Sequence, residues 1–153
     1  MLNIVLVNPQ IPPNTGNIAR LCAAMRLKLH LIHPLGFSVE DRYLKRAGLD
    51  YWPHVDLEHH NSVDDLWEKN KEGRFYYLTT KATQPYTSVK FQKGDFLVFG
   101  AETTGLNKDI LEPNWDRALT IVMPGQVRSL NLSSAVAMVA GEAMRQIESN
   151  ENI

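Results

Sequence analysis

Close to residue 130 the chain gathers four side chains that form hydrogen bonds, namely Arg128, Ser129, Asn131 and Ser133. From Leu132 onward the sequence turns apolar with helical spacing. Asparagine and serine are favoured at helix N-caps, because their side chains accept hydrogen bonds from the free N–H groups of the first turn. A capped helix start accounts for only one of these residues. The surplus, with an arginine beside it, predicts a loop that holds a ligand at a helix N-terminus.

A second polar block, Asn14-Thr15-Gly16-Asn17, precedes apolar residues at helical spacing. It predicts a helix that starts after an Asn14 or Thr15 cap, with Arg20 about one and a half turns further on. The planar fork of arginine suits phosphate or ribose oxygens. An exposed helix arginine with no ligand is the alternative interpretation.

A third block, residues 100–108, places Gly100, Glu102 and Gly105 after an apolar run. The two glycines are spaced as in a phosphate-binding P-loop, but Leu106 follows Gly105 where that loop requires lysine. We reject a P-loop, because Glu102 would also place negative charge beside a triphosphate. A carboxylate among glycines at a strand end fits a ribose hydroxyl or a cationic ligand better. No G-x-G-x-x-G follows the first apolar run, which disfavours a dinucleotide oxidoreductase.

Other catalytic and metal-binding chemistries find little support in the sequence. Ser129 lacks a G-x-S-x-G elbow and an adjacent histidine, which argues against a serine hydrolase. The single cysteine, Cys22, shares a helical face with apolar residues, so we expect a buried and unreactive thiol. The His59-His60 pair lies in no metal-ligand spacing, and we predict no metal site.

The elements that must position these blocks alternate between short apolar strands and longer helices. We predict strands at 3–7, 29–32, 54–59, 75–78, 96–99 and 119–123, and helices after residues 15 and 107 and at 40–47, 63–71 and 132–147. This order implies an α/β fold with a mostly parallel sheet and helices on both faces. Ligands of such sheets lie beyond the carboxyl ends of the strands. The loops after Leu78, at Gly100 and from Met123 to Asn131 are therefore expected to share one site.

The composition fits one globular domain over residues 1–153. The net charge of −1 argues against a protein that coats nucleic acid non-specifically. No apolar run is long enough for a membrane span, and the N-terminus lacks the features of a secretory signal, so we expect a cytoplasmic protein. The tail, residues 149–153, is expected to fray.

Taken in order, the three blocks resemble the three motifs of the SPOUT methyltransferases. The matching stretches are Asn14-Thr15-Gly16-Asn17-x-x-Arg20, Phe99-Gly100-x-Glu102-Thr103-x-Gly105-Leu106 and Arg128-Ser129-Leu130-Asn131-Leu132-Ser133. The resemblance covers essentially the whole chain and includes Leu35-Gly36-Phe37 and Ala47-Gly48-Leu49-Asp50-Tyr51. Within this class the sequence is most similar to the minimal tRNA (cytidine/uridine) 2′-O-methyltransferases that act on the wobble position.

The resemblance implies a deep C-terminal trefoil knot, S-adenosylmethionine as cofactor, the anticodon arm of tRNA as substrate, and a homodimer without metal or membrane. It implies cofactor contacts from Leu78, Thr79, Gly100, Glu102, Ile121, Met123, Ser129 and Leu130. It also implies that Arg20 contacts the target ribose or phosphate and helps to activate the hydroxyl. Asn14, Ser129 and Asn131 are the other expected catalytic residues. The expected RNA contacts are Arg20 and a cationic cluster of Arg42, Lys45 and Arg46.

Two positions depart from the family pattern. Val122 stands where the last strand commonly has proline, with Pro124 two residues later, and Gly141 stands where the final helix usually has tyrosine. A glycine inside a helix costs about 1 kcal/mol relative to alanine, and here it removes an aromatic side chain that could pack at a dimer seam. Three alternatives therefore remain: a knotted RNA- or nucleotide-binding module without catalysis, a 2′-O-methyltransferase for another tRNA or rRNA position, and a flavodoxin-like small-molecule binder.

Overall fold

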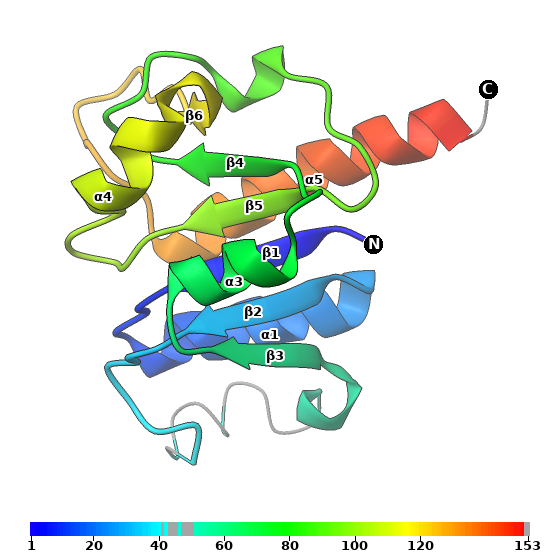
Figure 1. Cartoon of the computed structure of the whole chain (residues 1–153), viewed down its shortest axis with the longest axis vertical. Coiled ribbons are helices and arrows are strands. Elements are labelled where there is room, and N and C mark those ends of the chain that lie inside the picture. Colours follow the sequence, from blue (N-terminus) through cyan, green and yellow to red (C-terminus); the bar gives the residue numbers. More distant parts are fainter. Residues whose placement is uncertain (41, 43–45, 47–50, 152–153) are drawn as a thin grey trace.

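The computed structural model describes residues 1–40, 42, 46 and 51–151. Within these residues, six strands form one sheet in the order β3-β2-β1-β5-β4-β6 (Figure 1). The strands are β1 Asn3–Val7, β2 Lys28–Ile32, β3 Asp56–His60, β4 Phe75–Leu78, β5 Phe96–Phe99 and β6 Ala118–Leu119. Each neighbouring pair of strands runs parallel. The predicted parallel α/β sheet is thus confirmed.

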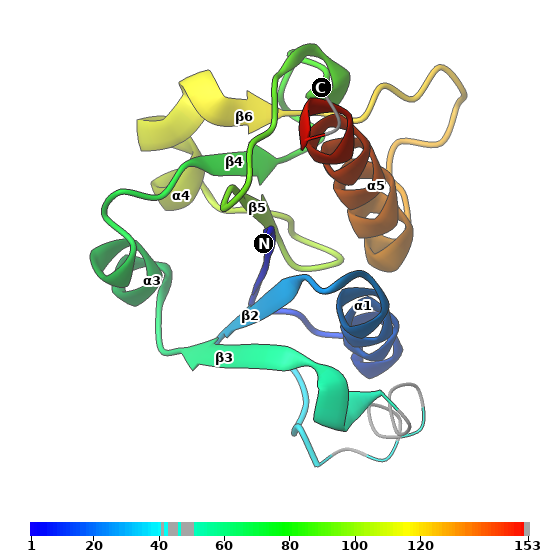
Figure 2. The ribbon, with the colours of Figure 1, turned by 90° about the vertical axis from the view of Figure 1, so that its right-hand side faces the viewer.

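Helices cover both faces of this sheet, as predicted. Figure 2 shows α1 and α5 on one face and α3 and α4 on the other. The α-helices are α1 Pro12–Met25, α3 Val63–Lys69, α4 Lys108–Leu111 and α5 Leu132–Glu151, and the 3-10 helices are η1 Trp52–His54, η2 Tyr86–Ser88 and η3 Glu112–Arg117. No helix in the described part of the chain is both long and apolar enough to cross a bilayer.

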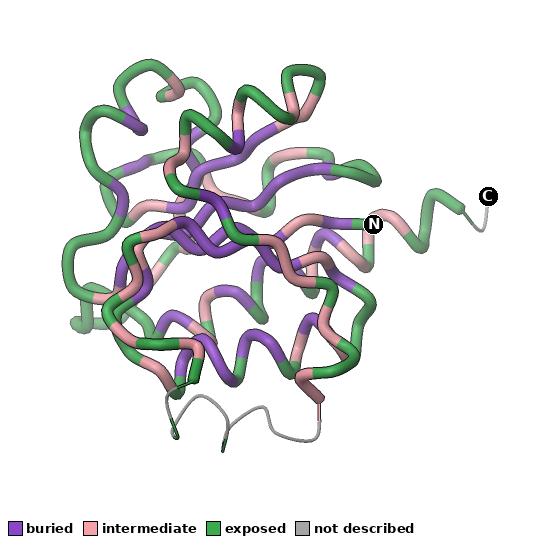
Figure 3. Tube along the Cα trace, turned by 60° about the horizontal axis from the view of Figure 1, so that its bottom comes forward, coloured by how far each residue is buried: buried purple, intermediate pink, exposed green. Residues whose placement is uncertain are grey.

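Apart from Asn3 at the start of β1, the residues of the central strands β1, β4 and β5 are buried hydrophobic or aromatic ones, as expected of strands that are covered on both faces (Figure 3). Ile4 and Leu6 of β1 belong to the core that α1 and α5 cover, whereas Val5 and Val7 belong to the core beneath α3 and α4. Successive side chains of a strand point to opposite faces, so one apolar run supplies both cores. The register of the sheet aligns the carboxyl ends of the strands at one edge. The loops that follow these strands therefore lie close together.

Helix α1 begins earlier than the sequence pattern predicts. Its first residue is Pro12, and its N-cap is Ile11, whose side chain makes no capping hydrogen bond. Proline suits the first helical position, because its fixed φ is helical and its missing N–H needs no partner there. Asn14 and Thr15 consequently lie inside the first turn, where both are buried. The predicted Asn14 or Thr15 cap is wrong.

The last strand and the last helix also differ from the predicted bounds. β6 ends at Leu119, four residues before Met123, because β4 ends at the paired Leu78. Thr120 instead exchanges backbone hydrogen bonds with residues 84 and 86, and residues 121–123 are loop. Helix α5 continues to Glu151, beyond the predicted end at residue 147 and into the tail that we expected to fray.

Gly141 lies on the exposed side of α5, and a Cβ added there would meet no atom within 4 Å. We expect Gly141→Ala to raise the free energy of unfolding by about 1 kcal/mol, because alanine loses less backbone entropy in a helix. Urea unfolding followed by circular dichroism checks this. A destabilised variant would show instead that another surface approaches α5 closely at this position.

A buried histidine pair joins β2 to β3, near the edge of the sheet. His30 Nδ1 lies 2.9 Å from His60 Nε2, and His30 Nε2 lies 2.9 Å from Asn3 Oδ1. Because Asn3 Nδ2 donates to the Gly94 carbonyl, its Oδ1 is the acceptor. His30 therefore carries its proton on Nε2 and accepts on Nδ1 from His60 Nε2, which makes the His30 ring neutral.

The same histidines and Glu58 form a group of potential metal-ligating side chains. Glu58 Oε2 lies 2.9 Å from Lys28 Nζ, however, and the His30 Nδ1 lone pair already accepts from His60. The group is thus built as a hydrogen-bonded and ion-paired network. The expected lack of a metal site stays a prediction.

We expect the free energy of unfolding to fall as the pH drops from about 6.5 to about 4, because burial lowers the pKa of His30 to about 4. In that window the unfolded chain binds a proton that the folded chain excludes, so acid favours unfolding. The difference from the ordinary pKa of 6.5 corresponds to about 3 kcal/mol. Urea titrations across this range measure the slope. His30→Gln should make the fall of stability with pH less steep, whereas the control variant His54→Gln, at an exposed position, should leave it unchanged. An unchanged slope in His30→Gln would contradict the role of His30 in this pH dependence.

Candidate active site

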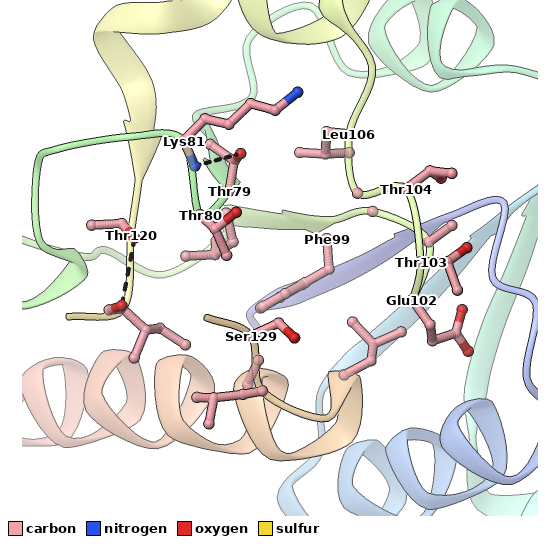
Figure 4. A pocket seen from close by; sticks show the side chains of 18 of the residues that line it. Thr79, Thr80, Lys81, Phe99, Glu102, Thr103, Thr104, Leu106, Thr120 and Ser129 are labelled. Atoms are coloured by element: carbon pink, nitrogen blue, oxygen red, sulfur yellow. Dashed lines mark hydrogen bonds between the residues drawn. The ribbon is translucent and has the colours of Figure 1, made fainter. Parts of the chain in front are cut away.

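A cavity of about 370 Å³ opens at the carboxyl ends of β4, β5 and β6, beside the start of α5 (Figure 4). This is the edge of the sheet where the strand-end rule predicts a ligand. We call it the strand-end pocket. All the residues expected to contact a cofactor line it: Leu78, Thr79, Gly100, Glu102, Ile121, Met123, Ser129 and Leu130. The structure therefore brings together three loops that lie far apart in the sequence.

The pocket combines apolar walls with hydroxyl groups. Leu78, Ile121 and Leu130 are among its apolar residues. Sequence reasoning missed Lys81 and several lining threonines, which are Thr80, Thr103, Thr104 and Thr120. Their positions directly after strands could have indicated them. Figure 4 shows Thr79 and Lys81 on one side of the pocket and Glu102 and Thr103 on the other.

Gly100 lets the loop after β5 fold back on itself. The Gly105 N–H donates to the Ala101 carbonyl over 2.9 Å, and Gly105 adopts a φ of +67°. A Cβ on Gly100 would lie 2.2 Å from the carbonyl carbon of Gly105 and 2.3 Å from the nitrogen of Leu106. Both are backbone atoms, so a side chain at this position would displace the loop. The first glycine of this block is thus required by the shape of the loop.

One chain of hydrogen bonds connects the three sequence blocks beside the pocket. Asn14 Nδ2 donates to Glu102 Oε2 over 3.1 Å, and Asn131 Nδ2 donates to Asn14 Oδ1 over 3.0 Å. We call this chain the motif bridge. Asn14 is buried and uses both ends of its amide, so its orientation is fixed. Residues from α1, from the loop after β5 and from the start of α5 thus hold one another in place.

Glu102 also holds the start of α1. Its Oε1 accepts the Gln10 N–H and its Oε2 accepts the Ile11 N–H, each over 2.8 Å. A carboxylate in this position satisfies free donors and interacts favourably with the helix dipole. With Asn14, these backbone groups give Glu102 three donors from the protein itself. Glu102 thus has a second possible role besides binding a ribose or a cation: it caps α1 from a distant loop.

Asn131 caps α5, as the first block predicts. Its Oδ1 accepts the N–H groups of Ser133 and Ser134 over 2.9 and 3.3 Å, and the Ser133 hydroxyl over 2.6 Å. Its Nδ2 remains for the motif bridge. Ser129 and Leu130, just before the cap, are the residues of this block that line the pocket together with the first residues of α5. The polar residues of this block therefore have different roles. Asn131 caps α5 and takes part in the motif bridge, and Ser129 lines the strand-end pocket.

Those cationic residues expected to contact RNA that the structure describes, Arg20, Arg42 and Arg46, are not among the residues that line the strand-end pocket. The Arg20 guanidinium carbon lies 4.7 Å from the centroid of the Tyr51 ring, and Arg20 is exposed. Arg42 and Arg46 are exposed as well. Lys45 lies outside the described residues. Arg20 is absent from the lining of the strand-end pocket within this one subunit, and its expected contact with the target ribose or phosphate stays a prediction.

The chain is similar to known methyltransferases along nearly its whole length. The family model described as SpoU rRNA Methylase matches residues 1–141. The tRNA (cytidine(34)-2'-O)-methyltransferase of Escherichia coli K12 is 46% identical over 148 residues, which cover 96% of this chain and 94% of that protein. A Bacillus subtilis protein to which the same activity is assigned is 51% identical over 148 residues, covering 95% and 92% of the two chains.

A solved structure described as "Structural insights into the 2-OH methylation of C/U34 on tRNA" superposes with a TM-score of 0.92. It is 46% identical and covers 95% of each chain. The ordered motifs, the pocket that they share and these comparisons agree with the resemblance seen in the sequence. The chain belongs to the SpoU rRNA methylase family.

Proposed function

We propose that this protein transfers a methyl group from S-adenosylmethionine to the ribose 2′-hydroxyl of the wobble nucleotide, cytidine or uridine, of tRNA. The observation that carries the proposal is the motif bridge, which joins all three methyltransferase motifs beside one pocket. The substrate is supported by the Escherichia coli relative, which is named for cytidine 34 of tRNA, and by the similar solved structure, which is described by methylation of C/U34. We place the reaction in the cytoplasm, together with its proposed tRNA substrate.

The residues of the strand-end pocket fit the proposed cofactor. Leu78, Ile121 and Leu130 supply apolar surfaces for an adenine ring, and the surrounding hydroxyl and backbone groups supply polar partners. S-adenosylmethionine, when bound, provides an electrophilic sulfonium methyl group. The expected threading of a trefoil knot stays a prediction. It is supported by the path of the chain, which leaves the sheet edge at β6 and returns to α5 packed against α1.

The main task of the chain in this reaction is to position the ribose. The new O–CH3 bond forms as the bond from carbon to sulfur breaks, and the hydroxyl proton is released to water. Positioning can supply about 7–11 kcal/mol, more than a general base supplies. The motif bridge supports this task, because it fixes the loops that face each other across the pocket. We assign Asn14 and Asn131 to positioning and Ser129 to contact with the ribose.

Arg20 is assigned to the activation of the hydroxyl in the pocket of a partner subunit. Arginine stays protonated at neutral pH, so it acts by stabilising the developing negative charge on oxygen. Its place outside the pocket of its own subunit supports a homodimer in which each Arg20 serves the other site. The exposed Arg42 and Arg46, with Lys45, are assigned to the anticodon arm. Binding of tRNA should therefore weaken steeply with salt.

Two measurements test the proposal. Calorimetry with S-adenosylmethionine tests the cofactor, and transfer of a labelled methyl group to total tRNA, followed by mapping of 2′-O-methyl positions, tests the reaction. The expected product is 2′-O-methylated nucleotide 34. Cofactor binding without transfer to any RNA would favour a binding module without catalysis. Methylation elsewhere would correct the position, and a failure to bind the cofactor would favour a flavodoxin-like binder.

A further inference from the structure

A second and larger cavity adjoins the strand-end pocket. Its volume is about 850 Å³, and it lies between residues 80–83 and residues 120–128. The two cavities share four lining residues, which are Thr80, Thr120, Ile121 and Met123. They therefore adjoin one another along the segment that follows β6. We call the second one the outer cavity.

The lining of the outer cavity is apolar and cationic. Val122 and Val127 are 64% and 72% exposed, which is unusual for apolar side chains that face a hollow. Gln126 adds an amide that can both donate and accept hydrogen bonds. Arg128 is the one charged side chain that the described residues contribute to this lining, and no carboxylate accompanies it. Such a surface suits a flat base attached to an anion.

We infer that the outer cavity binds the target nucleotide, with its base against Val122 and Val127 and an adjoining phosphate on Arg128. This inference rests on the proposed function. If the cofactor occupies the strand-end pocket, the reacting ribose must lie beside it, near the residues that line both cavities. The base and the phosphates of that nucleotide must then extend away from the cofactor, and the outer cavity is the space on that side.

Arg128 is suited to this role by its chemistry and by its place. A guanidinium binds phosphate through two parallel hydrogen bonds and can also stack on a base. Arg128 is exposed and directly precedes Ser129, which lines the strand-end pocket. It belongs to the polar block at residues 128–133, just before and at the start of α5. The cap of α5, the motif bridge and the lining of the strand-end pocket all form without the Arg128 side chain.

The variant Arg128→Gln tests the inference in the full-length chain. We expect unchanged affinity for S-adenosylmethionine, but a kcat/KM for tRNA that is lower by about 10- to 100-fold. The slope of log affinity against log salt should become shallower by about 0.7, the value for one phosphate contact on single-stranded nucleic acid. Arg128→Lys should keep the salt slope and recover only part of kcat/KM, since it retains the charge without the fork.

Lys71→Gln is the matched control. It removes the same charge just after the end of α3, where Lys71 pairs with Glu68 on the other face of the sheet. It should leave the cofactor affinity, the kcat/KM for tRNA and the salt slope unchanged. Unchanged kcat/KM in Arg128→Gln would overturn the inference. Loss of cofactor affinity would assign Arg128 to the strand-end pocket, and loss of the dimer in light scattering would assign the cavity to a partner subunit. A wild-type chain that methylates no tRNA would contradict the proposed function itself.

Discussion

Replacing Arg20 by alanine is expected to lower methyl transfer to tRNA by at least about 100-fold while leaving the affinity for S-adenosylmethionine unchanged. The separation of the two effects follows from the structure. Arg20 is exposed and lies over Tyr51, and it is not among the residues that line the strand-end pocket. Cofactor affinity is measured by calorimetry and transfer by incorporation of labelled methyl groups. Arg20→Lys should recover only part of the activity, because lysine keeps the charge but not the planar fork.

Mixed dimers decide whether Arg20 serves the partner's pocket. One subunit carries Arg20→Ala, and the other carries Leu130→Asp, which places a charge in an apolar wall of the pocket. If Arg20 acts across the interface, each mixed dimer has one complete site and regains about half of the wild-type activity. Each variant alone, as a homodimer, is the inactive control. Absence of recovery in the mixed dimers would show that Arg20 works within its own subunit, and full activity of Arg20→Ala would remove it from the reaction.

Gly100→Ala is expected to abolish measurable cofactor binding and to lower the free energy of unfolding by about 1–3 kcal/mol. The added Cβ would lie 2.2 Å from a backbone carbon of Gly105, so the loop that lines the pocket must move. Calorimetry and urea unfolding measure the two effects. Gly141→Ala is the matched control, because the same added methyl group meets no atom within 4 Å there. Normal cofactor affinity in Gly100→Ala would mean that the loop adapts without loss of the site.

The strands could be predicted from the sequence because their signal is local. Residues 3–7, 75–78 and 96–99 are buried on both faces, and an uninterrupted apolar run reports that burial directly. The strand-end rule then places the loops that form the pocket, with no further knowledge of packing. β6 was predicted too long, since Ile121 to Met123 continue the apolar run while the neighbouring β4 has already ended. The end of a strand depends on its partner, which a local pattern does not contain.

The motif bridge could not be predicted from the residues alone. Its two hydrogen bonds join residues that are 88 and 117 positions apart. Asn14 looks like a cap because asparagine is a favoured cap, but Pro12 starts the helix earlier and the distant Glu102 takes over the capping. The resemblance to a family pointed to the same residues without saying how they touch. Lys81 was missed, although its place shortly after the end of β4 could have indicated it.

The motif bridge also has a consequence for the order of events during synthesis. Asn14 emerges early, but its hydrogen-bond partner Asn131 is made 117 residues later. Contacts of such long range form late, because a large loop must first be closed. A nascent chain can therefore pair β1, β2 and β3 long before the pocket exists. We expect cofactor binding to begin only once the last helix has docked, so that occupancy by the methyl donor reports a chain that has finished folding.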